Sequence, residues 1–389
     1  MRRRIKNRLP ARRKRSHSTF PWLLVVLVLL GLSLVGWIWW QAGQAPVPTP
    51  QAKPIVVPPT VPIVPQTNRP PAKLQPQQPV EVVPVLPPPP IVKPTPELPR
   101  AAVFPRPVQN VFEAQLALGR QGISSGSLDG LIGSQTRAAL SAFQQRESLP
   151  VTGALDAATK ELLFLTNAPY ITYTVTTNDL ARLQPLSSTW FGKSQQTALD
   201  YETILELVAE KSHSHPNLIR QLNPSTDWTN VSAGTRLQVP DVAYADPPAK
   251  AAFVTISLAG KVLEAFDTSS NLLAHFPCSI GQRVEKRPVG ELHVAAIAPN
   301  PNYTFDPDVF PESAEARQLK TKLILPPGPN NPVGVAWISL DKPGYGIHGT
   351  PSPEQVGRTE SHGCFRLANW NAEYLIKLVW VGMPVYVEP

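Results

Sequence analysis

A cysteine and two histidines lie close together near the C-terminal end of the sequence. His348, His362 and Cys364 fall within seventeen residues, and glycines follow His348 and precede Cys364. A thiol is an efficient nucleophile as the thiolate, and a neighbouring imidazolium lowers the pKa of a thiol. We therefore predict that Cys364 is a nucleophile paired with a histidine base, and that the thiolate is its resting form.

The residues next to Cys364 supply the other groups that acyl transfer needs. The backbone amides at Gly363 and Cys364 can stabilise the oxyanion of a tetrahedral intermediate, because glycine leaves the backbone unshielded. Arg366 always carries a charge and presents a fork of donors that fits a carboxylate, although a structural ion pair is an alternative role. Ser361 offers a hydroxyl either to a substrate or to a turn.

Two other interpretations of this cluster do not involve a nucleophile. A lone buried cysteine behaves as a small hydrophobic residue, and this is one alternative for Cys364. The same cysteine together with His348 and His362 also has the side chains of a zinc site, since zinc accepts thiolate and imidazole ligands.

The segment that contains these residues resembles the catalytic signature of the L,D-transpeptidases of bacterial peptidoglycan. It reads Ile347-His348-Gly349-Thr350 and then Ser361-His362-Gly363-Cys364-Phe365-Arg366-Leu367. The resemblance implies that His348 is the acid/base partner of Cys364 and that His362 helps to shape the site. It also implies that Gly349 orients His348 through its carbonyl, a task that any residue could perform. Neither a metal nor an organic cofactor is implied.

Residues 251–389 predict a mainly β domain with one helix, which we expect to be the catalytic domain. β-Branched and apolar residues alternate in four segments bounded by turn-forming residues. These segments are 253–258, 261–266, 272–276 and 291–295. We expect a helix over 369–381 and a closing strand over 384–387. The resemblance implies a β-sandwich capped by a short helix.

The N-terminal end of the chain predicts a membrane anchor. Nine of the 36 basic residues lie in the tail 1–19, which has no acidic residue, and residues 20–40 carry no charge. Twenty-one helical residues span about 30 Å, the thickness of a bilayer core. The positive-inside rule then places the tail in the cytoplasm and the rest outside the inner membrane. A cleaved signal peptide is the alternative, because small residues follow at 42–45.

The strong positive charge of the chain belongs to that tail. The remaining residues carry 27 basic and 28 acidic side chains, so they give no argument for a nucleic-acid partner. Residues 41–107 contain 22 of the 47 prolines and predict a semi-rigid linker, which extends to about 200 Å at roughly 3.1 Å per residue. Such a linker is either a generic spacer or a tether that reaches the cell wall.

Two small modules are predicted between the linker and the catalytic domain. Residues 108–168 include a predicted helix at 135–146. They resemble the three-helix peptidoglycan-binding domain. The segment that carries this resemblance reads Leu128-Asp129-Gly130-Leu131-Ile132-Gly133-Ser134-Gln135-Thr136-Arg137-Ala138-Ala139-Leu140. Residues 169–245 contain two predicted helices, at 203–210 and 218–224, and a strand at 234–240.

The order of elements in 169–245 resembles a LysM-type module, which binds the sugar backbone of peptidoglycan. Its leading segment, 173–200, is long for such a module. Trp190, Tyr201 and Trp228 can stack on sugars, although isolated aromatic residues more often belong to a core or an interface.

The second cysteine, Cys278, is predicted to be a buried small residue. A disulfide with Cys364 is the alternative in an oxidising compartment, and it would remove the nucleophile. His275 and His293 fall in strand patterns, and His213 and His215 fall between the two predicted helices of 169–245, so none of these is assigned to the site.

The sequence therefore predicts a membrane-anchored L,D-transpeptidase that cross-links peptidoglycan in the periplasm. Its partners would be peptidoglycan stem peptides and glycan, with an amine of a second stem, a protein lysine or water as the acyl acceptor. Other interpretations are an inactive wall-binding protein and a thiol endopeptidase or carboxypeptidase. We also expect the two modules to bind the wall independently of the chemistry, so that deletion of 108–243 leaves acylation nearly unchanged.

Overall fold

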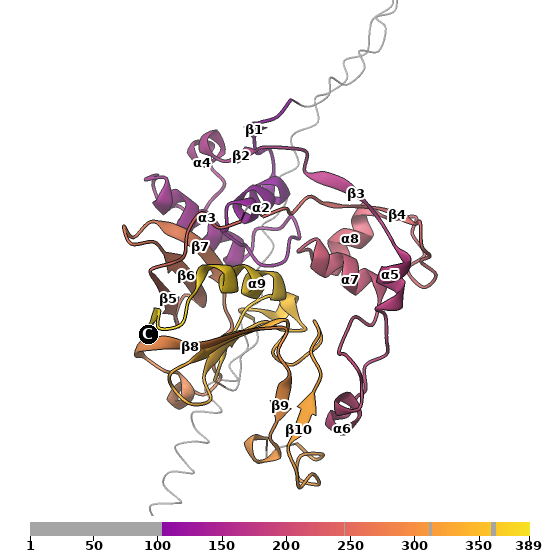
Figure 1. The fold of residues 1–389 in the computed structure, drawn as a ribbon. Helices are drawn as coiled ribbons and strands as arrows, with labels where there is room; N and C mark the ends of the chain where they lie inside the picture. Colours follow the sequence, from indigo (N-terminus) through magenta and orange to yellow (C-terminus); the bar gives the residue numbers. More distant parts are fainter. Residues whose placement is uncertain (1–102, 245, 311–312, 359–362) are drawn as a thin grey trace, which may run out of the picture. The chain divides into compact units, whose positions relative to one another are not determined.

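The computed structural model describes residues 103–244, 246–310, 313–358 and 363–389 (Figure 1). The predicted tail 1–19, the predicted anchor 20–40 and nearly all of the predicted linker 41–107 lie outside these residues. So do Ser361 and His362. Among the described residues, no helix is both long and apolar enough to cross a bilayer.

The C-terminal region is built on one eight-stranded sheet, whose strand order is β13-β12-β11-β8-β14-β5-β6-β7. Its strands are β5 (Phe253–Ser257), β6 (Val262–Phe266), β7 (Leu272–Pro277), β8 (Gly290–Pro299), β11 (Ala336–Leu340), β12 (Gly346–His348), β13 (Phe365–Arg366) and β14 (Pro384–Glu388). The strands that the sequence predicted at 253–258, 261–266, 272–276 and 384–387 are all present.

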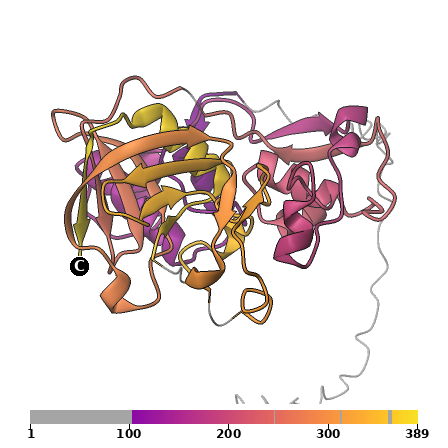
Figure 2. The same ribbon diagram turned by 60° about the horizontal axis from the view of Figure 1, so that its bottom comes forward.

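The sheet curls instead of forming the two separate layers of the expected β-sandwich (Figure 2). The reason is the length of β8, which runs for ten residues where the sequence predicted five. Its N-terminal half pairs with β14, and its C-terminal half pairs with β11, so one strand joins both halves of the sheet. The register of β11 against β8 shifts between Ser339 and Leu340, so the ladder between these two strands is irregular at that point.

One helix, α9 (Asn369–Leu378), packs on this sheet. Ala372, Leu375 and Leu378 follow the spacing of one helical face and are all buried in the sheet's core. Removal of the Leu375 side chain would cost roughly 2–5 kcal/mol by cavity formation. The helix ends three residues before the predicted end at 381, and its N-terminus lies directly after β13, close to the candidate site.

The region that follows the linker contains three helices: α2 (Val111–Arg120), α3 (Ser134–Arg146) and α4 (Ala157–Leu162). Asn110 caps α2 by accepting a hydrogen bond from the Glu113 amide. A short strand pair, β1 (Arg106–Pro107) with β2 (Phe164–Leu165), closes the region. Leu131, in the loop before α3, is an exception to the apolar pattern because it is 66% exposed.

Residues 170–240 form a β-α-α-β arrangement with an insertion. β3 (Tyr170–Thr174) pairs with β4 (Arg236–Pro240), and between them lie α7 (Ile204–Lys211) and α8 (Pro216–Leu222). Thr203 and Glu206 form a capping box at the start of α7, and Pro216 begins α8. The long leading segment that the sequence suggested contains two more short helices, α5 (Thr177–Ala181) and α6 (Trp190–Ser194).

A two-stranded hairpin extends from the catalytic region beside α6 (Figure 1). Its strands are β9 (Tyr303–Phe305) and β10 (Leu323–Leu325), and single-turn helices lie at Val284–Lys286, Pro307–Val309 and Pro353–Gln355. Leu199, Phe305, Ala316 and Leu325 form a small core between the hairpin and the α6 segment, and Trp190 packs against it.

The three-helix region is hydrogen-bonded to the edge of the large sheet. The amide of Ser124 donates to the His275 carbonyl at 2.8 Å, and the amide of His275 donates to the Gly122 carbonyl at 3.0 Å. Asn371 of α9 donates to the Ser124 hydroxyl at 3.1 Å. These contacts, with the α6 segment, make 103–389 part of one compact unit. Both modules therefore contact the catalytic region within this unit.

Candidate active site

Adjacent parallel strands bring Cys364, Arg366 and His348 to one side of the sheet. In the pairing of β12 with β13, Ile347 lies opposite Phe365 and His348 lies opposite Arg366. Ile347 and Phe365 are fully buried in the core. Because side chains alternate along a strand, Cys364 and Arg366 share a face, and His348 lies on that face of the neighbouring strand.

His348 is fixed by its own strand neighbours. Its Nδ1 lies 2.6 Å from the carbonyl oxygen of Gly349, and its ring stacks on Trp337 with 5.5 Å between ring centroids. A carbonyl only accepts hydrogen bonds, so Nδ1 carries the proton and Nε2 is left as an acceptor. This is the tautomer that a general base needs, and the hydrogen bond is the one that the family resemblance implied.

Gly349 does more than offer its carbonyl. A Cβ at this position would lie 2.2 Å from Asn369 Oδ1 and 3.3 Å from Gly334 Cα. The same Oδ1 accepts hydrogen bonds from the amides of Thr350, at 3.0 Å, and Val335, at 3.3 Å. The expectation that any residue could serve at 349 is therefore wrong, because Asn369 occupies the space that a side chain would need.

The Cys364 side chain is partly buried at the end of β13. Its Sγ lies 3.5 Å from the Gly344 carbonyl oxygen. Burial raises the pKa of the Cys364 thiol, while a hydrogen bond with the Gly346 backbone and the charge of Arg366 act in the opposite direction. The net direction favours the neutral thiol at neutral pH.

Burial also keeps His348 neutral. It lowers the pKa of the imidazole to about 4; the Gly349 hydrogen bond opposes this change and the charge of Arg366 adds to it. A neutral imidazole beside a neutral thiol differs from the thiolate–imidazolium pair that the sequence suggested. The physical reason is that both side chains lie where charge is poorly solvated.

Tyr303 of β9 is a further member of the site that the sequence did not reveal. Burial raises the pKa of its hydroxyl to about 12. The charge of Cys364 adds to this rise, and the charge of Arg366 opposes it. The hydroxyl is therefore a hydrogen-bond donor at neutral pH. Burial likewise lowers the pKa of Arg366, with Cys364 and Tyr303 opposing that change. No motif marks Tyr303, since it reaches the site only through the folding of the hairpin.

A cavity of about 420 Å³ opens beside Arg366. Apolar and neutral polar groups of the catalytic region form most of its lining, namely Ser279, Asn330, Pro332, Thr350, Pro351, Ser352, Gln355 and Val356. The remaining lining residues are Trp190 and Lys193, which belong to α6. The sequence marked Trp190 as a candidate for sugar stacking or an interface, and the structure places it at this interface. Lys193 was not singled out.

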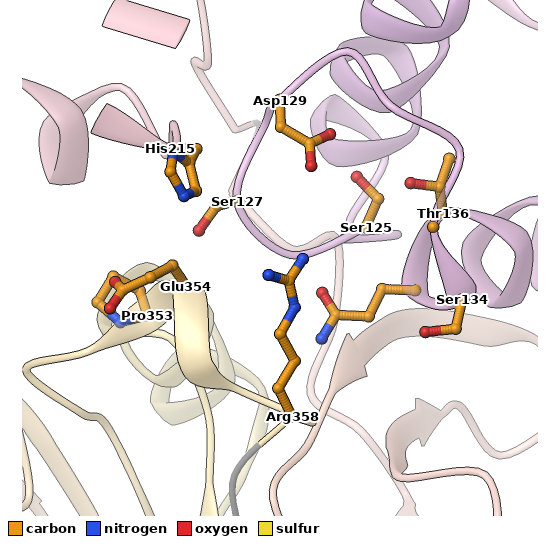
Figure 3. A pocket seen from close by; sticks show the side chains of 11 residues that line it. Ser125, Ser127, Asp129, Ser134, Thr136, His215, Pro353, Glu354 and Arg358 are labelled. Carbon is orange, nitrogen blue, oxygen red and sulfur yellow. The ribbon is translucent and has the colours of Figure 1, made fainter. Parts of the chain in front are cut away.

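A smaller pocket lies where the three-helix region, α8 and the loop 353–358 meet (Figure 3). The Arg358 side chain reaches toward the loop that carries Ser125 and Asp129, and His215 lies beside Ser127. The hydroxyls of Ser125 and Ser127 are buried and have no hydrogen-bond partner among the described residues. The pocket holds about 40 Å³, which suits about one water molecule better than a substrate.

Cys278 is a free, fully buried cysteine, as predicted, and Cys364 is also free. Burial raises the pKa of the Cys278 thiol well above its usual range, so this thiol is inert. His275 pairs with Glu264 at 2.8 Å within the sheet, and His213 and His215 lie between α7 and α8. Tyr201 is buried and Trp228 packs against the core of residues 170–240.

Comparisons with known proteins agree with this arrangement. Residues 251–387 match the L,D-transpeptidase catalytic domain, and residues 107–163 match a putative peptidoglycan binding domain. A putative L,D-transpeptidase of Bacillus licheniformis is 27% identical over 186 residues, which are 48% of this chain and 93% of that protein. A putative L,D-transpeptidase of Fuscovulum blasticum is 32% identical over 138 residues, which are 33% and 70% of the two chains.

Among solved structures, L,D-transpeptidase 3 of Mycobacterium tuberculosis is 17% identical and has a TM-score of 0.29; the match covers 41% of this chain and 76% of that one. The sequence relationships above are sufficient to define the class: the chain belongs to the L,D-transpeptidase family. It is an enzyme of the peptidoglycan transpeptidase class, joined to a peptidoglycan-binding region, as the sequence predicted.

Proposed function

We propose that Cys364 is acylated by the tetrapeptide stem of peptidoglycan and passes the acyl group to an amine. Its Sγ attacks the carbonyl carbon at the L-centre of diaminopimelate while His348 Nε2 takes the thiol proton. Collapse of the tetrahedral intermediate breaks the amide bond, and His348 gives its proton to the departing D-alanine. A thioester on Cys364 results.

The acceptor amine then attacks this thioester. His348 takes a proton from the amine and gives it to the Cys364 sulfur as the C–S bond breaks and the new amide forms, so the cysteine and the neutral histidine are both restored. The amine of a second diaminopimelate gives a cross-link, a protein lysine gives protein attachment, and water gives a carboxypeptidase. The family membership supports the first of these as the main reaction.

One observation carries the assignment of these roles. His348 lies on the same side of the sheet as Cys364, one strand away, with its Nδ1 hydrogen-bonded to Gly349 and its pKa lowered to about 4. Such an imidazole is already in the basic form at neutral pH. It can therefore accept the thiol proton during attack, which makes a resting thiolate unnecessary.

The remaining roles are proposed from position and chemistry. The amides of Gly363 and Cys364 stabilise the oxyanion, and His362 shapes the site next to them. Arg366 binds a carboxylate of the stem peptide, and Ser361 contributes a hydroxyl. We assign Tyr303 as a hydrogen-bond donor to the bound stem, because its hydroxyl stays protonated at neutral pH.

The N-terminal parts would deliver this site to its substrate. Residues 20–40 would anchor the chain in the inner membrane, and the linker would carry residues 108–389 into the periplasm. The β3-α7-α8-β4 order supports a LysM-like module within 169–245 that binds glycan. The three-helix region 108–168 would bind peptidoglycan beside it.

Product analysis tests the proposal. The full chain would be incubated with a disaccharide-tetrapeptide, and the products identified by mass. Dimers that have lost one D-alanine support transpeptidation, while monomers that have lost D-alanine or fragments of the stem indicate hydrolysis instead. Binding to wall sacculi without any product would indicate an inactive wall-binding protein. Cys364→Ala is the control, and it should give no product.

A further inference from the structure

Helix α6 belongs to the region 170–240, yet it forms one wall of the cavity beside Arg366. The cavity, at about 420 Å³, is within the usual size range of small-ligand sites and fits part of a peptide better than a glycan chain. Residues from two regions therefore build one substrate-sized space beside Arg366, two residues along the chain from the candidate nucleophile.

Among the residues that the structure describes, the charged side chains that line this space are both positive. Lys193 from α6 and Arg366 from β13 are its two charged lining residues, and none of the described residues that line it is acidic. Two positive charges in one cavity, surrounded by neutral polar groups and proline, favour a ligand that carries negative charge. A stem peptide carries several carboxylates.

Helix α6 is held in place by the catalytic region. The Trp190 ring stacks on Phe305 with 4.3 Å between centroids and 15° between planes. The Glu315 carboxylate accepts hydrogen bonds from the amides of Trp190 and Phe191, both at 2.9 Å. The position of α6 is thus set by the β9–β10 hairpin and its neighbouring loop, which means that its side chains are preorganised for binding.

The ammonium group of Lys193 is positioned but not neutralised. It lies 5.5 Å from the centroid of the Trp190 ring, a distance at which a cation is attracted to an indole. Within the part of the chain that the structure describes, Lys193 Nζ makes no ion pair with a carboxylate. A contact with a ring face leaves its N–H groups able to donate to a ligand.

We propose that Lys193 binds a free carboxylate of the donor stem peptide, and that α6 thereby makes the region 170–240 a determinant of substrate specificity. This inference rests on the proposed acylation of Cys364. Arg366 would bind one carboxylate, and Lys193 would bind a second one farther from the reacting carbonyl. A donor whose diaminopimelate carboxylate is converted to an amide would lose the interaction with Lys193.

The test compares two donors and three variants of the full chain. Acylation kinetics would be measured with a disaccharide-tetrapeptide whose diaminopimelate carboxylate is either free or amidated. Lys193→Gln removes the charge and Lys193→Arg keeps it. Lys320→Gln is the matched control, since Lys320 is exposed and does not line the cavity.

We expect Lys193→Gln to raise KM for the free-carboxylate donor roughly tenfold or more, the scale of one hydrogen bond to a charged group, with little change in kcat. KM for the amidated donor should stay unchanged, and Lys193→Arg should keep most of the wild-type affinity. Alkylation of Cys364 by a small reagent should be equal in all variants, which shows that the site remains folded.

Equal KM values for wild type and Lys193→Gln on both donors would overturn the role of Lys193 while leaving the acylation mechanism intact. A loss of affinity that is the same for both donors would also overturn it, because the effect would not depend on the carboxylate. Absence of any acyl-enzyme in the wild-type protein with either donor would refute both this inference and the proposed function.

Discussion

At the scale of single residues, the account depends on the charge states of Cys364 and His348. Two buried neutral groups avoid the cost of placing an ion pair in a poorly solvated site. The proton then moves only when substrate is bound, and the oxyanion donors compensate the charge that develops. This arrangement also protects the thiol from small electrophiles in the resting enzyme.

The first prediction concerns alkylation of Cys364 by iodoacetamide as a function of pH. Burial disfavours the thiolate, so the midpoint of alkylation should lie above about 8.5, the value of a free cysteine. His348→Gln should leave this midpoint nearly unchanged, yet reduce acylation by the peptide donor by roughly 10²–10⁴-fold. An alkylation midpoint well below pH 8.5 that rises in His348→Gln would instead support a thiolate–imidazolium pair in the resting enzyme.

The second prediction concerns Gly349. A methyl group at this position meets Asn369 Oδ1, which in turn holds the Thr350 amide, so Gly349→Ala should destabilise the protein by roughly 1–3 kcal/mol. Acylation should fall as well, because His348 is displaced with its neighbour. Urea unfolding and acylation rates check both effects. Gly133→Ala is the control, since no atom lies within 4 Å of its Cβ position; it should leave acylation unchanged and cost at most about 1 kcal/mol of stability, because Gly133 is the N-cap residue of α3.

At this scale the sequence could propose candidate site residues within the motif but not those outside it. His348, Gly349, Cys364 and Arg366 are adjacent to one another in two short segments, so their types and spacing could be recognised. Tyr303 and Lys193 reach the site from distant segments, and nothing in their local sequence marks them. The charge states could not be predicted either, since they depend on burial.

At the scale of elements, Asn369 at the start of α9 connects the active-site loop to α7. Its Oδ1 accepts from the Thr350 amide, and its Nδ2 donates to the Glu210 carboxyl at 2.9 Å. Burial raises the pKa of Glu210 to about 8. The nearby carboxyl groups of Glu206 and Glu373 add to this rise, and the hydrogen bonds from Asn369 and Tyr201 oppose it. The hydrogen bonds from Asn369 and Tyr201 favour the ionised carboxylate, but burial outweighs them, so the folded protein favours the protonated form of Glu210 at neutral pH.

The third prediction is that Glu210 makes stability depend on pH. Its folded-state pKa, about 8, exceeds its unfolded value near 4.5, so the folded protein binds the extra proton between these values. Stability should therefore fall as pH rises from about 5 to 8. Glu210→Gln cannot ionise and should show a smaller fall in thermal midpoint over that range. Glu161→Gln, a change at an exposed glutamate of α4, should show the same fall in thermal midpoint with pH as the wild type. An equal fall in all three proteins would contradict the assignment of this pH dependence to Glu210.

Element bounds were predictable where the pattern is regular. Strands β5, β6, β7 and β14 follow alternating apolar residues, and α3 follows a helical spacing, so all were found within one or two residues. The C-terminal half of β8 carries three alanines and a single proline, Pro299, and was missed. That omission concealed the connection between the two halves of the sheet, which is why a sandwich was expected. β9 and β10 have three residues each, too few for any period to be read.

At the scale of the whole molecule, the described regions depend on one another. The three-helix region completes the hydrogen bonding of His275 at the sheet edge, and α6 covers the small core of the β9–β10 hairpin. The region that matches a peptidoglycan-binding domain and the catalytic region consequently belong to one compact unit. The proposed anchor and linker would set only how far that body reaches from the membrane.

The fourth prediction replaces the expectation that the modules can be removed freely. Deletion of 108–243 leaves the backbone groups of His275 unpaired and exposes Leu325 and Phe305, so the thermal midpoint and acylation should both fall. Deletion of 1–91, a separate unit, is the control and should leave the midpoint unchanged. A truncated catalytic region with wild-type stability and acylation would show that the contacts between regions are incidental.

The central claim is that Cys364 forms a thioester with the donor stem. The most direct measurement is the mass of the intact chain after incubation with a disaccharide-tetrapeptide and rapid acid quenching, followed by peptide mapping. The account predicts an increase equal to the donor minus D-alanine, located on the peptide that contains Cys364 and absent from Cys364→Ala. An adduct on the peptide that contains Cys278, or cross-linked product formed by Cys364→Ala, would contradict it.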